Sequence, residues 1–129
     1  MSDKKKVMLI IDDKNISNCI VSNLGNNGYD IRTINSDDRV LENIQHYKPE
    51  IILVDVNLEK TDASYLSKTI KEKNGNRNLK IILIEHGISN GNINNADDHL
   101  ITPFSISQLL SKIGTSVTTL VDDGEAICR

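Results

Sequence analysis

Two short aliphatic runs of the sequence end in carboxylates. The run 51–54 ends at Asp55, and the run 7–11 ends at Asp12 and Asp13. Runs this short and this apolar are typical of strands that are buried on both faces of a parallel sheet. The carboxyl ends of such strands lie along one edge of the sheet, where ligands bind. We therefore expect the three aspartates to converge on one spot at that edge.

Three converging carboxylates are suited to holding a divalent cation. Mg²⁺ and Mn²⁺ prefer oxygen ligands, and Mg²⁺ keeps positions open for water and phosphate oxygens. A carboxylate beside the cation can attack a phosphoryl group and form an acyl phosphate, because the metal offsets the repulsion between two anions. The simpler alternative is that Asp12, Asp13 and Asp55 only begin loops and cap helices.

The strands that must position these residues are predicted at five places. Apolar runs and alternating patterns place them over 7–11, 29–33, 51–55, 79–84 and 100–101. The second of these is expected to be a half-buried edge strand, because its apolar residues alternate with charged ones.

Helical spacing of apolar residues predicts four helices between and after these strands. They begin near residue 16 and after three N-cap candidates, Ser36, Asp62 and Ser105. The segment 86–98 is rich in Asn and Gly, which favour turns, so a helix there is expected to be shortened or absent. Strands that alternate with helices imply an α/β fold, with a parallel sheet covered on both faces.

Length, charge and cysteines limit the possible functions. The 129 residues correspond to one domain, expected over 1–121, with 122–129 as a tail or linker remnant. The net charge of −3 disfavours a nucleic-acid surface, which needs a basic stripe. No stretch is long enough to span a membrane. Cys19 and Cys128 stand far apart without framework spacing, which favours a reduced, cytoplasmic setting.

Over roughly residues 5–117 the sequence resembles the receiver domain of bacterial response regulators. Asp12 and Asp13 resemble the acidic pair of that family, and Asp55 resembles its phosphoacceptor. Asn57 is at the position whose backbone carbonyl contacts Mg²⁺ in the family. The stretch 96–104 resembles the run through the last strand to a Lys-Pro-Phe ending.

The resemblance implies a flavodoxin-like doubly wound sheet of five parallel strands in the order 2-1-3-4-5. It implies that Asp12, Asp13, Asp55 and Asn57 hold Mg²⁺ or Mn²⁺ while Asp55 accepts a phosphoryl group. The implied donor is a sensor histidine kinase or a phosphotransfer protein. The signal would pass by protein–protein contact to a downstream protein or a fused output domain, so we expect a signalling domain and not an enzyme.

Three departures from the family pattern concern residues with a role in its chemistry or switching. Thr102 replaces the lysine that pairs with the acceptor, and a hydroxyl carries no charge to stabilise the transition state. Glu85 replaces a Ser or Thr that binds the phosphoryl group, and His99 replaces the aromatic switch residue. If Glu85 points inward, four carboxylates share one pocket, and a bound cation should then stabilise the fold more than it would with the lysine present. These departures leave open an alternative, a pseudo-receiver that binds partners without being phosphorylated.

Overall fold

The computed structural model of the chain describes residues 5–36, 39–73, 78–87, 96–114 and 127–128. Its central element is a sheet of five parallel strands in the order β2-β1-β3-β4-β5, which confirms the predicted fold class. The strands are β1 (Lys6–Ile10), β2 (Asp30–Ile34), β3 (Ile51–Asp55), β4 (Lys80–His86) and β5 (Asp98–Thr102).

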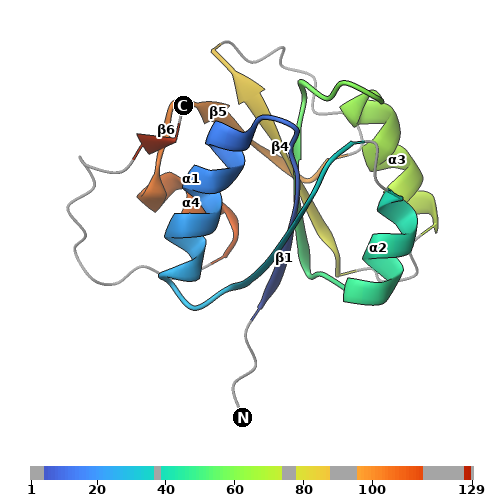
Figure 1. Cartoon of the computed structure of the whole chain (residues 1–129), viewed down its shortest axis with the longest axis horizontal. Coiled ribbons are helices and arrows are strands. Elements are labelled where there is room, and N and C mark those ends of the chain that lie inside the picture. The colour runs from blue at the N-terminus through green and yellow to red at the C-terminus, as the bar shows by residue number, and fades with distance from the viewer. Residues whose placement is uncertain (1–4, 37–38, 74–77, 88–95, 115–126, 129) are drawn as a thin grey trace.

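Helices cover both faces of the sheet, as Figure 1 shows. One face carries α1 (Lys14–Gly25) and α4 (Ile106–Lys112), and the other carries α2 (Val40–Tyr47) and α3 (Ala63–Lys73). Each face has its own aliphatic core, because successive residues of a strand point to opposite faces. Burying each of these Ile, Leu and Val side chains contributes roughly 1.5–3 kcal/mol.

The central strand β3 carries the phosphoacceptor candidate to the edge of the sheet. All five of its residues are buried, including Asp55 at its end. By contrast, β2 lies at the edge of the sheet, as predicted, but it is largely exposed where a half-buried strand was expected. Because β1 and β3 are neighbours in parallel register, the loops that follow them emerge side by side.

Two of the three predicted N-caps are confirmed and one is wrong. Asp62 Oδ1 accepts a hydrogen bond from the Ser64 amide at 2.7 Å, and Ser105 forms a capping box with Gln108. Ser36 does not cap α2, which begins at Val40. Its hydroxyl donates instead to a charged acceptor, a carboxylate in the loop after β1, and hydrogen bonds to charged groups are the stronger ones.

The C-terminal part of the chain differs from its expected form. Strand β5 is longer than predicted and is followed by a cis Thr102–Pro103 bond and a short strand, β6 (Phe104–Ser105). Strand β6 pairs antiparallel with β7 (Ile127–Cys128), in the segment where the sequence shows no pattern. The helix predicted after Ser105 is α4, which ends at Lys112. The predicted loss of a helix within 86–98 lies mainly outside the described residues.

Two further findings concern membrane spans and cysteine pairing. In the part of the chain that the structure describes, no helix is both long and apolar enough to cross a membrane. Cys19 on α1 is disulfide-bonded, so its interpretation as a lone thiol is wrong. The argument for a reducing compartment from unpaired cysteines therefore loses its basis.

Candidate functional site

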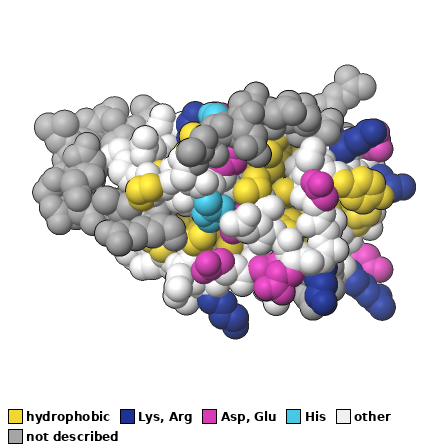
Figure 2. Space-filling view, turned by 90° about the horizontal axis from the view of Figure 1, so that it is seen from above, with side chains coloured by type: hydrophobic (Ala, Val, Ile, Leu, Met, Phe, Trp, Pro, Cys, Tyr) yellow, Lys and Arg dark blue, Asp and Glu magenta, His cyan; other side chains and the backbone are white. Residues whose placement is uncertain are grey.

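A cavity of about 380 Å³ opens at the carboxyl ends of β1, β3 and β4, and we call it the acidic cavity. The structure places all four predicted metal-site residues on its wall, and Figure 2 shows acidic side chains in magenta around a histidine in cyan when the molecule is seen from above. Among the described residues, it is lined by Asp12, Asp13, Ile16, Asp55, Asn57, Glu59 and His86.

Asp55 is the most deeply placed acid of the acidic cavity, with only 1% of its surface exposed. Its Oδ1 accepts a hydrogen bond from the Asn57 amide at 3.0 Å and lies 2.7 Å from Nε2 of His86. Its Oδ2 is buried and has no hydrogen-bond partner among the described residues. One oxygen of the carboxylate is therefore held in place, and the other has no donor among the described residues.

Asp12 joins three loops at the rim of the acidic cavity. Its two oxygens accept from the amide and the hydroxyl of Ser36 at 2.8 and 2.6 Å, and from the Glu59 amide at 2.8 Å. Burial raises the pKa of Asp12, but the hydrogen bonds from Ser36 and Glu59, with the charge of Lys60, outweigh it and leave the pKa below its ordinary value. The loops after β1, β2 and β3 are thus tied to one carboxylate.

Asp13 caps helix α1 and is exposed to solvent. Its Oδ1 accepts from the amides of Asn15 and Ile16 at 2.8 and 3.3 Å. This arrangement satisfies amides that the first helical turn would otherwise leave unpaired. Asp13 therefore has the helix-capping role that was the simpler alternative. It also lines the acidic cavity.

The donors of the acidic cavity fit a hard divalent cation in type but do not form a compact cluster. Within the described ranges, no group of three or more His, Cys, Asp or Glu side chains is placed to hold a metal ion. Each aspartate is turned toward a protein partner, and both oxygens of Asp12 are already engaged. Asp13, Asp55 and Asn57 are the residues that would hold Mg²⁺, because carboxylate and carbonyl oxygens are its preferred ligands.

His86 lies between Asp55 and Thr102 and contacts both side chains. Its Nε2 lies 2.7 Å from Oδ1 of Asp55, and its Nδ1 lies 3.1 Å from Oγ1 of Thr102. The ring is held between these contacts because β4 and β5 are in parallel register, with His86 opposite Thr102.

His86 is absent from the predicted site residues, because the three histidines are scattered along the chain. The alternation of side chains along a strand offered one signal. It puts His86 on the same face as Ile84, which is the register partner of Asp55. Using that signal requires the register between strands, which no local pattern provides.

Glu85 lies on the opposite face of β4 and does not line the acidic cavity. It is buried, and its Oε1 pairs with Nδ1 of His99 at 3.0 Å. The expected pocket of four carboxylates that included Glu85 is therefore wrong, and the fourth acid there is Glu59. Glu85 and His99, the residues that resemble the family's hydroxyl and aromatic switch positions, therefore contact each other instead of Asp55.

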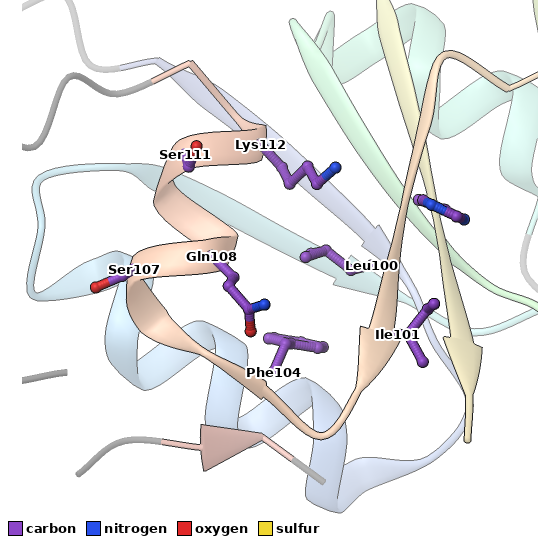
Figure 3. Close-up of a pocket in the computed structure, with 8 residues that line it drawn as sticks. Leu100, Ile101, Phe104, Ser107, Gln108, Ser111 and Lys112 are labelled. Carbon is purple, nitrogen blue, oxygen red and sulfur yellow. The ribbon is translucent and has the colours of Figure 1, made fainter. Parts of the chain in front are cut away.

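A second cavity of about 390 Å³ lies between β5 and α4 (Figure 3). Leu100, Phe104 and Gln108 lie on its wall, and Lys112 reaches across from α4 to Oδ1 of Asp98 at 3.0 Å. Burial raises the pKa of Asp98, but the hydrogen bonds from Lys112 and the His99 amide outweigh it and lower the pKa overall. This ion pair fastens the last helix to the last strand of the sheet.

Comparison with known proteins identifies relatives along most of the chain. A family model described as "Response regulator receiver domain" matches residues 7–114. The chain is 24% identical over 116 residues to the alkaline phosphatase synthesis transcriptional regulatory protein PhoP of Bacillus subtilis, covering 84% of this chain and 47% of that protein. It is 26% identical over 113 residues to the sensory transduction protein BceR of Halalkalibacterium halodurans, covering 84% and 48%. The chain thus spans about half the length of these curated relatives.

Solved structures share the same architecture. The Vibrio cholerae chemotaxis protein CheY4 superposes with a TM-score of 0.77 at 21% sequence identity, covering 86% of this chain and 97% of that one. The N-terminal domain of the nisin resistance regulator NsrR, a lantibiotic response regulator, gives a TM-score of 0.74 at 22% identity over 86% and 96%. These likenesses agree with the observed strand order.

Proposed function

The chain belongs to the response regulator receiver domain family, and we propose that it accepts a phosphoryl group on Asp55 in phosphorelay signalling. It is thus a receiver domain of the kind found in two-component response regulators. The observation that supports the proposal is the state of Asp55, which is buried in the wall of the acidic cavity while its Oδ2 has no hydrogen-bond partner among the described residues.

A buried carboxylate oxygen without a donor is costly, because water no longer solvates its charge. A carboxylate with only a structural task would be expected to have its oxygens satisfied locally, as those of Asp12 are. The phosphorus of an incoming group, or a cation that accompanies it, would give Oδ2 of Asp55 the partner it lacks. A reactive role therefore accounts for a feature that a structural role leaves unexplained.

In the proposed reaction, a lone pair of Asp55 Oδ2 attacks the phosphorus of the donor and forms a new oxygen–phosphorus bond. The bond from phosphorus to the leaving atom breaks, and its electron pair departs with the leaving group. The product is an acyl phosphate on Asp55. Bound Mg²⁺ would offset the charge of the phosphoryl oxygens.

We propose a sensor histidine kinase or a phosphotransfer protein as the phosphoryl donor. The recipient of the signal is a downstream protein or a fused output domain, since the curated relatives are regulatory and sensory transduction proteins about twice as long. The domain itself acts as a switch and turns over no separate substrate.

We propose a cytoplasmic location on the basis of this signalling role. Cell fractionation followed by immunoblotting checks this location. Recovery of the protein outside the cytoplasmic fraction contradicts it.

The test of the phosphoacceptor is incubation with acetyl phosphate and Mg²⁺, followed by intact mass spectrometry. We expect the mass gain of one phosphoryl group in the natural protein and none in Asp55→Asn. Asp62→Asn is the matched control, because Asp62 caps α3 outside the acidic cavity and Asn caps helices equally well. A natural protein that gains no mass contradicts the proposal and favours the pseudo-receiver.

A further inference from the structure

We propose that His86 is a catalytic residue of this receiver domain, donating to the acceptor carboxylate the hydrogen bond that the family lysine would give, and that Thr102 positions its ring. The inference rests on the proposed function, because it assigns a role in phosphorylation of Asp55. His86 is not at one of the positions through which the sequence resembles the family.

The composition of the acidic cavity supports the need for such a donor. Four carboxylates line it, from Asp12, Asp13, Asp55 and Glu59. Among the described residues that line the acidic cavity, His86 and Asn57 are the two whose side chains carry nitrogen donors. The His86 ring contacts Asp55 directly and can donate whether it is neutral or protonated. A phosphoryl donor is itself an anion, so a site of carboxylates alone would repel it.

The contact between His86 and Asp55 decides which oxygen can react. The 2.7 Å separation between Nε2 and Oδ1 is typical of a short hydrogen bond to a charged acceptor. With the Asn57 amide also donating to Oδ1, the carboxylate cannot rotate without losing two bonds. Oδ2 is then the nucleophile, and the attack begins from a fixed orientation.

Thr102 suits the task of holding the imidazole ring. Its side chain is buried, and Oγ1 lies 3.1 Å from Nδ1 of His86. A hydroxyl can donate to a bare ring nitrogen or accept from a protonated one, whereas a lysine ammonium can only donate. Thr102 therefore supports donation from Nε2 of His86 in either ring state, and the change from lysine to threonine at this position fits the presence of the histidine.

An alternative role for the His86 ring is to block the access of a phosphoryl donor to Asp55. The side chain of His86 is 26% exposed and that of Asp55 is 1% exposed, so the ring lies on the outer side of the acceptor. A barrier slows phosphorylation through its volume, whereas a donor speeds it through its N–H group. Substitutions that separate volume from hydrogen bonding distinguish the two.

The experiment measures the rate of mass gain from acetyl phosphate and Mg²⁺ in three variants at His86. His86→Leu keeps volume without a donor, His86→Gln keeps a donor near the position of Nε2, and His86→Ala removes both. Loss of one preorganised donor costs roughly 10²–10³ in rate where it acts fully, so we expect His86→Leu and His86→Ala to be slower by about tenfold or more. We expect His86→Gln to recover most of the rate. His46→Ala, which removes an exposed imidazole from α2, is the control and should match the natural protein.

Two further variants test the link to Thr102. We expect the double variant His86→Ala/Thr102→Lys to regain phosphorylation, because it restores the family's donor. We expect Thr102→Val to slow the reaction by less than His86→Leu does. In metal-free protein, Thr102→Val should also shift the ¹⁵N NMR signals of the His86 ring, a readout that does not depend on activity. Urea unfolding of each variant identifies a rate loss that comes only from unfolding.

The outcomes separate this inference from the proposed function. Failure of the natural protein to gain mass contradicts both. An active natural protein with His86→Leu equally fast, or with His86→Ala faster, overturns the role of His86 alone and supports the barrier. Unchanged ring signals in Thr102→Val overturn the positioning role of Thr102.

Discussion

At the scale of single residues, Glu85 and His99 form a pair through a short side-chain contact. Oε1 of Glu85 lies 3.0 Å from Nδ1 of His99, and the Glu85 side chain is only 6% exposed. A buried carboxylate depends on such a partner, because removing it leaves an unsatisfied charge away from water. The pair therefore links β4 to the start of β5 on the face opposite His86.

Removal of His99 should destabilise the domain. We expect His99→Ala to lower the free energy of unfolding by about 1–3 kcal/mol, the usual cost of leaving a buried polar group unsatisfied. The double variant Glu85→Leu/His99→Leu should lie closer to the natural protein, since both polar groups are then gone. Urea denaturation measures both, with His46→Ala as the exposed control. A His99→Ala protein as stable as the natural one contradicts the importance of this pair.

Asp12 should make stability depend on pH. Its folded pKa is lowered, because its hydrogen bonds outweigh the effect of burial. A lowered folded pKa stabilises the fold above the unfolded value of about 3.9, and that contribution is lost as the pH falls through the folded pKa. We expect Asp12→Asn to be less stable than the natural protein at pH 7 and to approach it below about pH 4. Urea midpoints across this range check it, and a constant difference at every pH would contradict it.

At the scale of elements, the start of α4 depends on one capping box. Ser105 Oγ accepts from the Gln108 amide at 3.1 Å, and Gln108 Oε1 accepts from the Ser105 amide at 2.8 Å. This short helix contributes Leu109 and Leu110 to the core on the α1 face of the sheet. Its first turn therefore fixes how the segment after β5 returns to the sheet.

Loss of this cap should weaken the domain measurably. We expect Ser105→Ala to cost about 0.5–2 kcal/mol, the usual effect of removing an N-cap hydroxyl. Ser111→Ala is the matched control, because Ser111 is an exposed residue of the same helix and makes no capping bond at its start. Thermal and urea unfolding measure both variants. Equal losses at Ser105 and Ser111 would show that the capping box contributes nothing.

At the scale of the whole molecule, the acidic cavity joins parts of the chain that are far apart in sequence. It receives residues from the ends of β1, β3 and β4, while the cores on the two faces of the sheet hold those strands in register. Carboxylates gathered in this way repel one another in the folded state more than in the unfolded chain. A cation that binds only the folded protein therefore adds stability by mass action.

Mg²⁺ should accordingly raise the melting temperature. At 100 times its dissociation constant, a ligand of the folded state contributes about 2.7 kcal/mol. We expect a smaller shift in Asp13→Asn, which keeps the helix cap because Asn caps as well as Asp but removes the charge. We also expect a smaller shift in Thr102→Lys, whose ammonium would balance part of the acidic cavity. Thermal melts with and without Mg²⁺ measure the shifts, and equal shifts in all three proteins would count against this site.

The sequence by itself determined the order of elements and the ends of the strands that carry the acids. Buried strands read as short aliphatic runs, and Asp12, Asp13 and Asp55 follow those runs directly. Asp62 and Ser105 were also predictable as N-caps, because capping acts within a few residues of the chain. These features depend on local spacing, which is fully present in the sequence.

The tertiary structure alone decided the partner of each polar residue. Ser36 was predicted to cap a helix and instead binds Asp12, which is 24 residues away. Asp55, His86 and Thr102 meet because β3, β4 and β5 are neighbours in a fixed register, and the same alternation turns Glu85 to the other face. Such contacts depend on how the strands align once the cores have packed. The sequence does not show them, because strand register is set by long-range packing and not by local spacing.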